Sequence, residues 1–369
     1  MSQTDTSVNK RLAAVTAAGT SVWLDQISRS LIETGELATM VKEYSLRGLT
    51  SNPAIFEKAI NGAEEYDEQF TSLNEAGKDA REIYQELAIK DIQDAADILR
   101  PVYDESDGLD GFVSFEVDPD LAQDADKTIA QAREYWSRVD RPNLMIKIPG
   151  TPEGLGPIET AISEGINVNV TLLFSVQAYA TVAEAFIKGL EKRHAAGESL
   201  DVQSVASFFV SRVDSEVDKR LEELDKPELA GKAGLANARA AYIKFKEIFH
   251  GERFAELKAA GAPVQRPLWA STGTKNPDYP DTLYVDGLVG PETVNTMPMA
   301  TLKAAAERTE VDPANPTVDI DPEHDLLALG GAGIDMDDVT AKLLTDGIAA
   351  FVTPMESLLE GIEKKRSEA

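Results

Sequence analysis

The sequence predicts an α/β fold made of a single (β/α)8 TIM barrel with additional helices, especially towards the C-terminus. Short apolar runs rich in Val, Ile, Leu and Phe recur along almost the whole chain, and longer stretches of helical periodicity with charged outer faces separate them. This alternation is typical of βαβ units and a parallel sheet. The runs number about eight, which is the number of strands that closes such a barrel.

The size and composition suit one large domain. The 369 residues are 43% hydrophobic and 27% charged, so the chain can bury a large core. No composition shift divides the chain, and we therefore expect a single domain over residues 1–369.

The expected strands are the apolar runs themselves. In chain order they cover residues 21–24, 46–50, 111–116, 144–148, 167–173, 205–209, 268–271 and 282–285.

The segments between these runs are expected to be helical or to form loops. Residues 1–18 should form an N-terminal helical segment. Residues 82–99 place apolar side chains on one stripe, and Arg100-Pro101 should end that helix. Residues 175–194 have a similar pattern, and residues 214–258 are long enough for two or three helices. Residues 310–325, rich in Pro and Asp, predict an exposed loop, and residues 332–369 predict C-terminal helices.

Charge and residue usage exclude several function classes. The formal net charge of −28 would repel nucleic acid and anionic lipid surfaces, so we expect neither as a partner. The chain has no cysteine, which excludes thiolate catalysis and cysteine-based metal sites. Its three histidines, His194, His250 and His324, lie far apart in polar surroundings, so we expect surface residues, no metal and no cofactor.

No apolar run is long enough to span a membrane, and the N-terminus does not resemble a signal peptide. We therefore expect a cytoplasmic protein without a membrane partner, as a monomer or homodimer.

Polar residues stand at the carboxyl ends of the expected strands. Barrel enzymes build their active sites at that end. In chain order these residues are Asp25, then Ser51-Asn52, then Glu116, then Lys147, then Asn169 with Thr171, then Ser207 with Arg212, and then Ser271 with Lys275.

Lys147 is the most informative of them, because it lies inside the apolar run Leu-Met-Ile-Lys-Ile-Pro. Desolvation disfavours an ammonium ion, lowers its pKa and makes the amine available as a nucleophile toward a carbonyl. The alternative is a lysine that reaches solvent or forms a structural ion pair with Glu116 or Asp25.

A carbonyl-attacking amine needs proton transfer twice, when the imine forms and when a carbon–carbon bond breaks. Asp25 and Glu116, each at the end of a strand, could supply these two roles, although either could instead be a helix cap or a surface charge. The amides of Asn52 and Asn169 suit the recognition of hydroxyl groups. Asn52 is followed by Pro53, so a turn or helix start is its alternative role.

Arg212 and Lys275 are basic residues on an acidic molecule. The segment Ser271-Thr-Gly-Thr-Lys275 combines hydroxyl groups, a glycine and a cation, which suits a phosphate group. Loops after the late strands of barrels often bind phosphate. Taken singly, each basic residue could also be a solvated surface charge.

Two stretches of the sequence resemble the transaldolases. One is Gly48-Leu-Thr-Ser-Asn-Pro-Ala-Ile55, which is similar to the Thr-[Ser/Thr]-Asn-Pro signature of that family. The other runs from Leu144-Met-Ile-Lys-Ile-Pro-Gly-Thr-Pro-Glu-Gly-Leu155 to Gly165-Ile-Asn-Val-Asn-Val-Thr-Leu-Leu-Phe174, and it resembles the active-site lysine segment and the strand after it. At the level of motifs, the resemblance covers about residues 21–294.

The resemblance implies a barrel whose fourth strand carries a Schiff-base lysine, Lys147, and a reaction that moves a dihydroxyacetone unit from sedoheptulose 7-phosphate to glyceraldehyde 3-phosphate. This reaction belongs to the non-oxidative pentose phosphate pathway. The resemblance implies that Asp25 is the acid/base at the bond being cleaved, and that Glu116 and Thr171 position and activate a water.

The same resemblance implies roles in substrate binding for the remaining residues. Asn52, Asn169 and Ser207 would hold the dihydroxyacetone hydroxyl groups, and Phe209 would line the pocket. Arg212, Ser271 and Lys275 would bind the phosphate of the sugar-phosphate substrate. The chain departs from the shorter members, which carry an arginine close after the seventh-strand serine, because here Gly273 and Thr274 stand before Lys275.

Two other functions fit the same residues. One is a lyase of the fructose 6-phosphate aldolase type, which releases free dihydroxyacetone and would turn over without an acceptor. The other is a non-catalytic barrel that binds sugar phosphates, whose function would survive replacement of Lys147 by alanine.

Overall fold

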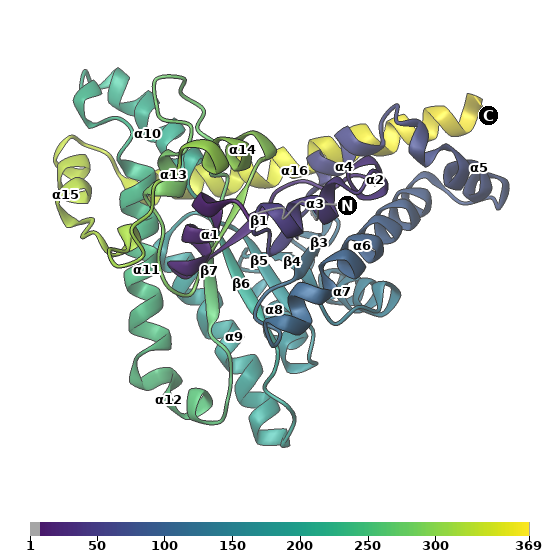
Figure 1. Ribbon diagram of the computed structural model, residues 1–369, viewed down its shortest axis with the longest axis horizontal. Helices are drawn as coiled ribbons and strands as arrows, with labels where there is room; N and C mark the ends of the chain where they lie inside the picture. The colour runs from purple at the N-terminus through teal and green to yellow at the C-terminus, as the bar shows by residue number, and fades with distance from the viewer. Residues whose placement is uncertain (1–7, 369) are drawn as a thin grey trace, which may run out of the picture.

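The computed structural model describes residues 8–368 and contains a closed barrel of eight parallel strands, which confirms the predicted fold class. Neighbouring strands follow chain order, and β8 pairs with β1 to close the barrel. Every strand residue is buried, as expected of a barrel whose interior is filled with side chains. Helices surround the outside of the barrel (Figure 1). The strands are β1 Thr20–Leu24, β2 Gly48–Thr50, β3 Phe112–Glu116, β4 Leu144–Pro149, β5 Val168–Leu173, β6 Ser204–Phe209, β7 Gln265–Ala270 and β8 Thr293–Met297.

The prediction of the eighth strand was wrong. Residues 282–285 were expected as a strand, but a short helix, α13 (Leu283–Asp286), lies there, and β8 follows later in the chain. The hydroxyl of Thr282 donates to Asp286 four residues on, which stabilises a helical turn. β8 has the sequence Thr-Val-Asn-Thr-Met, and its buried polar residues hid it from a search for apolar runs.

The long helix after β2 also differs from the prediction at its end. α6 spans Ala80–Glu105 and begins with a capping box of Asp79 and Glu82, but it continues through Pro101. Pro101 is exposed, so its ring lies on the solvent side, while Leu99 and Val102 keep the helix packed on the core. The loss of one backbone hydrogen bond at an exposed position therefore does not end the helix.

The other predicted helical regions are confirmed. α9 spans Val176–Ala196, with Ser175 as its N-cap and Gly197 in the left-handed conformation after it. Residues 214–258 hold the greater part of three α-helices, α10 Ser211–Glu223, α11 Ala233–Phe249 and α12 Glu252–Ala259, and the short 3-10 helix η3 Pro227–Leu229. The remaining elements before α15 are α1 Lys10–Ala17, α2 Arg29–Glu33, α3 Glu36–Glu43, α4 Pro53–Ile60, η1 Glu64–Tyr66, α5 Asp67–Glu75, η2 Pro119–Leu121, α7 Ala125–Val139, α8 Leu155–Ser163, α14 Met299–Arg308 and η4 Thr317–Asp319.

The two ends of the chain follow the prediction only in part. Of the expected helical segment 1–18, residues 1–7 lie outside the described residues, and α1 occupies most of the rest. Residues 310–325 are largely exposed, but Val318 of η4 is fully buried and donates its N–H to the carbonyl of Val289. The first C-terminal helix, α15 (Glu323–Gly331), begins inside that predicted loop, and the described residues 332–368 hold one helix instead of several, α16 (Met336–Glu368).

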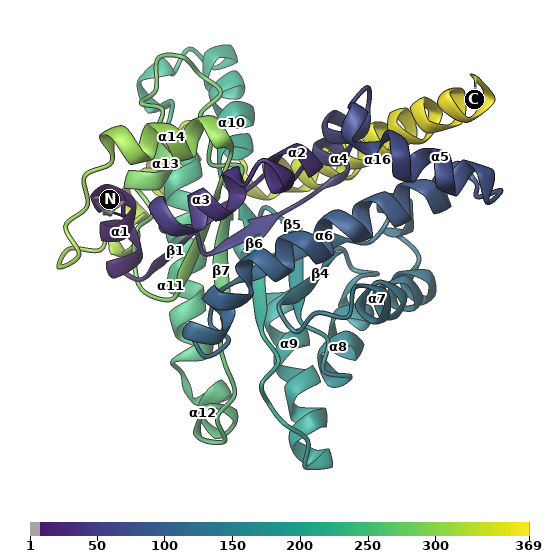
Figure 2. The same ribbon diagram turned by 45° about the vertical axis from the view of Figure 1, so that its right-hand side comes forward.

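α16 runs across the carboxyl end of the barrel. It packs against α4, α6, α10, η2 and the end of β5, and both ribbon views show it beside α4 (Figures 1 and 2). A helix in this position can contribute side chains to a site at the strand ends.

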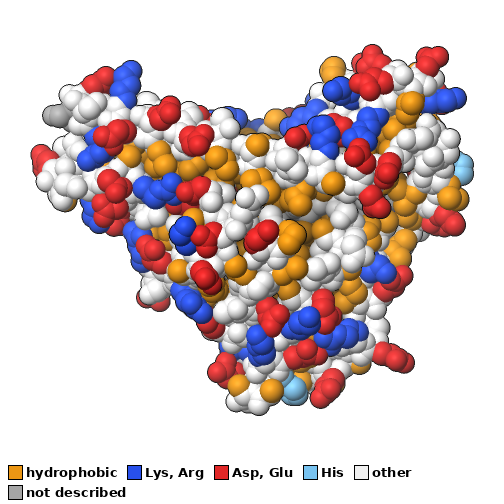
Figure 3. Space-filling model, turned by 180° about the vertical axis from the view of Figure 1, so that it is seen from behind, with side chains coloured by type: hydrophobic (Ala, Val, Ile, Leu, Met, Phe, Trp, Pro, Cys, Tyr) orange, Lys and Arg blue, Asp and Glu red, His pale blue; other side chains and the backbone are white. Residues whose placement is uncertain are grey.

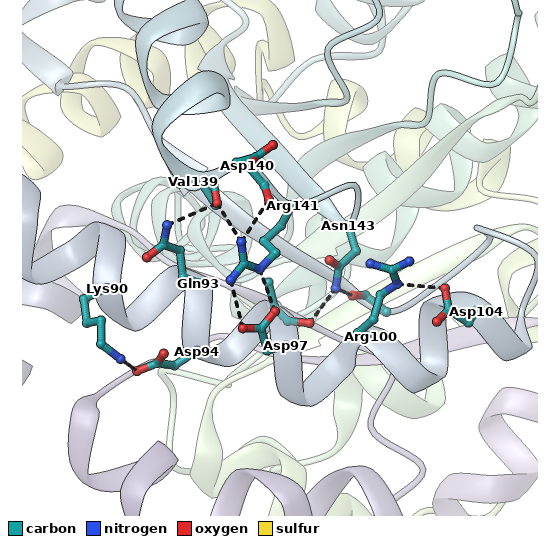
Figure 4. Close-up of polar contacts among 12 residues, drawn as sticks. Lys90, Gln93, Asp94, Asp97, Arg100, Asp104, Val139, Asp140, Arg141 and Asn143 are labelled. Carbon is teal, nitrogen blue, oxygen red and sulfur yellow. Dashed lines mark hydrogen bonds and ion pairs between the residues drawn. The ribbon is translucent and has the colours of Figure 1, made fainter.

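A network of polar contacts fixes the start of β4, the strand that carries Lys147 (Figure 4). Arg141, in the turn after α7, forms two hydrogen bonds with the carboxylate of Asp97 on α6, at 2.6 and 3.0 Å. The buried amide of Asn143 donates to the carbonyls of Ala96 and Gly111, both at 2.8 Å. These contacts tie the residues just before β4 to α6 and to the chain just before β3.

The described surface is mixed in charge. Figure 3 shows acidic and basic side chains interspersed over one face, with histidines at its edge, and His194, His250 and His324 are all exposed. Between Val8 and Glu368, no helix combines the length and the apolar content that crossing a membrane requires.

Candidate active site

A cavity of about 190 Å³ opens at the carboxyl end of the barrel. It gathers nine of the eleven site residues expected from the sequence. The other two, Glu116 and Asn169, lie directly behind it, in contact with Lys147 and Ser207. The residues that line the cavity are Asp25, Thr50, Asn52, Lys147, Thr171, Ser207, Phe209, Arg212, Ala270, Ser271, Lys275, Thr296, Pro298 and Phe351.

Lys147 lies on β4 at the floor of this cavity, with only 4% of its surface exposed. Its neighbours Ile146 and Ile148 are fully buried on the opposite face of the strand. Its Nζ donates to Glu116 Oε2 at 2.9 Å and to the carbonyl of Ser51 at 3.0 Å. The ion pair considered as an alternative is therefore present. A buried pair of this kind is weak support for a stabilising role. The same carboxylate is within hydrogen-bonding distance to accept a proton from the amine.

Glu116 is the partner of Lys147 in the register of β3 and β4. Burial raises the pKa of the Glu116 carboxyl, the charge of Lys147 opposes that shift, and the nearby charge of Asp25 adds to it. Its second oxygen, Oε1, is buried and accepts no hydrogen bond from the described residues. The hydroxyl of Thr171 on β5 is likewise buried without a partner there. Two polar atoms close to the lysine are thus free to bind a small polar molecule.

Asp25 stands at the end of β1 and accepts a hydrogen bond from the Thr50 hydroxyl at 2.6 Å. Burial raises the pKa of the Asp25 carboxyl, while the charge of Lys147 and the hydrogen bond from Thr50 oppose the shift. Thr50 and Thr296 lie 2.7 Å apart, and because the single Thr50 proton goes to Asp25, Thr296 donates in this pair. A chain of hydroxyl groups therefore orients the carboxylate.

The amides occupy two different positions. Asn169 Nδ2 donates to Ser114 at 3.0 Å, and its Oδ1 accepts from Ser207 at 2.7 Å, so Asn169 orients a serine that reaches the cavity. Asn52 caps α4 by accepting from the N–H of Ile55, which confirms the helix start predicted for Asn52-Pro53. Asn52 also lines the cavity. Its Oδ1 is used by the helix cap, so its amide nitrogen is the atom that remains available to the cavity.

The mouth of the cavity carries the basic residues. Arg212, at the start of α10, lies with its Cζ 5.2 Å from the centre of the Phe209 ring. Lys275 is exposed at the rim, and within the described residues neither Arg212 nor Lys275 forms an ion pair. Ser271 has a positive φ of 56°, and its hydroxyl lies 2.9 Å from that of Ser211, which holds the loop after β7 against α10.

Sequence reasoning missed several residues of this cavity. Thr296 was missed because β8 was placed too early in the chain, and Thr50 because it is the last residue of the expected strand 46–50, directly before Ser51-Asn52. Phe351 comes from α16, an element outside the strand ends. A search for buried polar residues at strand ends could have found the two threonines, whereas no strand-end pattern points to Phe351.

The fold and the site define a (β/α)8-barrel enzyme with a buried lysine and two carboxyl groups at the carboxyl ends of its strands. Residues 22–362 match the family model described as transaldolase/fructose-6-phosphate aldolase, so the match extends into α16, beyond the range of the motifs. Proteins named transaldolase from Saccharopolyspora erythraea, Mycolicibacterium smegmatis and Trichodesmium erythraeum are similar to the chain. Their identities are 48%, 49% and 47%, over 98%, 96% and 97% of this chain and 100%, 97% and 98% of their own lengths.

The chain belongs to the transaldolase/fructose-6-phosphate aldolase family, and its function is that of a transaldolase, an enzyme that transfers aldehyde or ketone residues.

Proposed function

We propose that this transaldolase works through a Schiff base on Lys147 and transfers a dihydroxyacetone unit from sedoheptulose 7-phosphate to glyceraldehyde 3-phosphate, in the pentose phosphate pathway. The products are erythrose 4-phosphate and fructose 6-phosphate. The observation that carries the proposal is the buried amine of Lys147, 2.9 Å from a carboxylate at the floor of the cavity. A cytoplasmic location and a monomeric or homodimeric state stay predictions.

The first step is attack of the amine on the ketone carbon C2 of the donor. Lys147 Nζ must lose a proton to attack, and Glu116 Oε2 is its hydrogen-bonded acceptor. Because the pKa of the Glu116 carboxyl is raised, it accepts a proton more readily than an ordinary surface carboxylate. The proton returns to the carbinolamine oxygen, water leaves, and an iminium ion remains.

Glu116 and Thr171 are suited to handle that water. Glu116 Oε1 and Thr171 Oγ1 are both buried and lack hydrogen-bond partners among the described residues. The carboxylate oxygen of Glu116 can accept a hydrogen bond, and the hydroxyl of Thr171 can donate or accept one. Together they can orient a water toward C2. The same water reverses the step when the finished ketose is hydrolysed from Lys147.

Cleavage of the C3–C4 bond needs a base at the C4 hydroxyl. Asp25 lies across the cavity, and the hydroxyl of Thr50 orients it. When Asp25 takes the C4 proton, the electrons of the C3–C4 bond move to the iminium nitrogen, and the aldose phosphate leaves. The three-carbon unit stays on Lys147 as an enamine. An acceptor aldehyde then forms the new bond at the same carbon, and Asp25 returns the proton to its oxygen.

The remaining residues suit recognition of the substrate. Asn52 and Ser207 face the cavity beside Phe209 and can bind the hydroxyl groups of the three-carbon unit, and Asn169 orients Ser207 from behind. Arg212, Ser271 and Lys275 lie at the mouth, where the phosphate of the sugar chain would end. On a chain of net charge −28, two cations without ion-pair partners in the described part favour this position for an anion.

Reduction with borohydride tests the covalent step. With fructose 6-phosphate present, the mass of the reduced three-carbon or six-carbon adduct should appear on the peptide that contains Lys147. Lys147→Ala should show no adduct and lose at least about a thousandfold in kcat, and Lys147→Arg, which keeps the positive charge, should be equally inactive. An adduct on another lysine, or full activity in either variant, would contradict the proposal.

A second assay separates transfer from simple cleavage. With fructose 6-phosphate as donor, sedoheptulose 7-phosphate should form only when erythrose 4-phosphate is added. Sustained release of free dihydroxyacetone without acceptor, at a rate equal to transfer, would favour the lyase alternative.

A further inference from the structure

α16 places one aromatic ring over the reactive lysine. Its buried residues recur at spacings of three and four, from Thr340 to Ile362, so one stripe of the helix faces the barrel. Phe351 lies in the middle of this stripe with 4% of its surface exposed, and it is the member of the stripe that lines the cavity.

The Phe351 ring lies between the two ends of the proposed substrate site. Lys147 Nζ is 5.4 Å from the ring centre, and Arg212 Cζ is 6.0 Å from it. Lys147 Nζ donates to Glu116 and to the carbonyl of Ser51, both on the strand side, and the ring covers it from the side of α16. An aromatic ring in this position offers no proton to a reacting carbon and displaces water from it.

A specific contact sets how deeply this ring enters the cavity. Gly347 stands one helical turn before Phe351, and a Cβ atom there would lie 3.1 Å from the side chain of Leu172 and 3.3 Å from the ring of Phe174. Leu172 has a positive φ of 61° at a register shift in β5, directly after Thr171. For a leucine this conformation costs roughly 1–2 kcal/mol, so packing must hold it.

The bulge in β5 and the missing side chain of Gly347 therefore act together. The bulge brings Leu172 against the helix, and the glycine lets the helix approach closely. Because Phe351 is on the next turn of the same face, the depth of its ring follows from this contact.

We propose that Phe351 is a specificity-determining residue that favours transfer over release of the three-carbon unit, which deepens the function proposed above and rests on it. After the aldose phosphate leaves, the enamine on Lys147 has two possible fates. If the acceptor aldehyde meets its nucleophilic carbon, a carbon–carbon bond forms. If a proton from water adds to that carbon instead, an iminium ion results, and addition of one water at C2 then frees dihydroxyacetone and the lysine amine. The ring of Phe351 keeps bulk water from the enamine until the acceptor enters.

The partition between the two fates is the quantity to measure. The rate of free dihydroxyacetone release from fructose 6-phosphate alone is divided by the rate of sedoheptulose 7-phosphate formation with erythrose 4-phosphate. Truncation of the ring in Phe351→Ala should raise this ratio by about tenfold or more. Phe351→Leu retains apolar bulk and should raise it by only a few fold. Lower trapping of the three-carbon adduct by borohydride should accompany the rise.

Met355→Ala is the matched control. Met355 lies one turn further on the same buried stripe, with 3% exposure, but it does not line the cavity. Met355→Ala should loosen the packing of α16 to a similar degree and leave the ratio of release to transfer unchanged. An unchanged ratio in folded Phe351→Leu and Phe351→Ala, or an equal rise in Met355→Ala, would overturn the proposal.

The same experiment distinguishes failure of the role of Phe351 from failure of the Schiff-base function. If borohydride labels Lys147 in the unaltered protein and the ratio does not respond to Phe351, only the role of Phe351 fails. If the unaltered protein gives no adduct on Lys147, the Schiff-base function itself fails.

Discussion

The amino end of the barrel contains a buried ion pair whose removal should weaken the fold and spare the chemistry. Arg266 at the start of β7 and Asp110 just before β3 are 5% and 6% exposed, and their side chains meet at 3.1 Å. Ser21 at the start of β1 donates to Asp110 at 2.8 Å and accepts from Arg266 at 2.9 Å. In Asp110→Ala the guanidinium loses its counter-ion while it stays buried.

The structure sets the expected magnitude. Breaking a buried pair from one side destabilises a protein by about 3–5 kcal/mol, and the value here should be near the lower limit, because Arg266 keeps its hydrogen bond to the carbonyl of Leu109 at 2.6 Å. At an unfolding entropy of about 2.1 cal/mol/K per residue, or roughly 0.8 kcal/mol/K for the chain, a loss of about 3 kcal/mol lowers Tm by about 4 °C. The double variant Asp110→Leu/Arg266→Met should be more stable than the single variant, since it leaves no uncompensated charge.

Thermal melts and the transfer assay, run on the same samples, check this prediction. Asp97→Ala is the matched control. The Asp97–Arg141 pair (Figure 4) has side-chain exposures of 54% and 31%, so it should contribute less than about 1 kcal/mol. Activity at 25 °C should be unchanged in all these variants, since the cavity is at the other end of the barrel. The reasoning is refuted if Asp110→Ala melts no lower than Asp97→Ala, or if it loses kcat without losing stability.

Three further changes have defined outcomes. Thr50→Val removes the donor to Asp25 and raises the pKa of that carboxyl further, so the acidic limb of the pH profile of kcat/KM should move to higher pH, whereas Thr50→Ser should leave it in place. Burial raises the pKa of Asp214 to about 6. Because the folded pKa lies above the unfolded one, its contribution to stability is lost as the pH rises from 4 through 6. Relative to the native protein, Asp214→Asn should gain roughly 2–3 kcal/mol between pH 4 and 7, and a pH-independent difference in urea midpoints would contradict this. Gly347→Ala gains up to about 1 kcal/mol of helix propensity but presses on Leu172, so Tm should change little while dihydroxyacetone release rises; higher stability with unchanged release would count against the contact.

The strands whose apolar runs end in polar residues could be predicted from the sequence. Strand register decides which of these side chains are neighbours, and in the adjacent parallel strands Glu116 pairs with Lys147 and Lys147 with Asn169. The interior of β8 breaks that pattern, because Thr293, Asn295 and Thr296 are buried polar residues whose partners come from distant strands and loops. A buried polar strand has no apolar signal of its own, and its identity depends on partners that only the closed barrel provides.

The position of Phe351 depends on a different kind of information. The sequence of α16 shows an amphipathic stripe, and such a stripe predicts that one face is buried without saying against which end of the barrel. That choice depends on the path of the chain from β8 through α14 and α15, and on the fit between Gly347 and the bulge at Leu172. Residues fixed by register perform the bond-making steps in the proposed mechanism, whereas the residue fixed by packing controls what reaches the intermediate. The two classes should therefore separate in kinetics, with Lys147 and Asp25 variants losing both release and transfer and Phe351 variants changing their ratio.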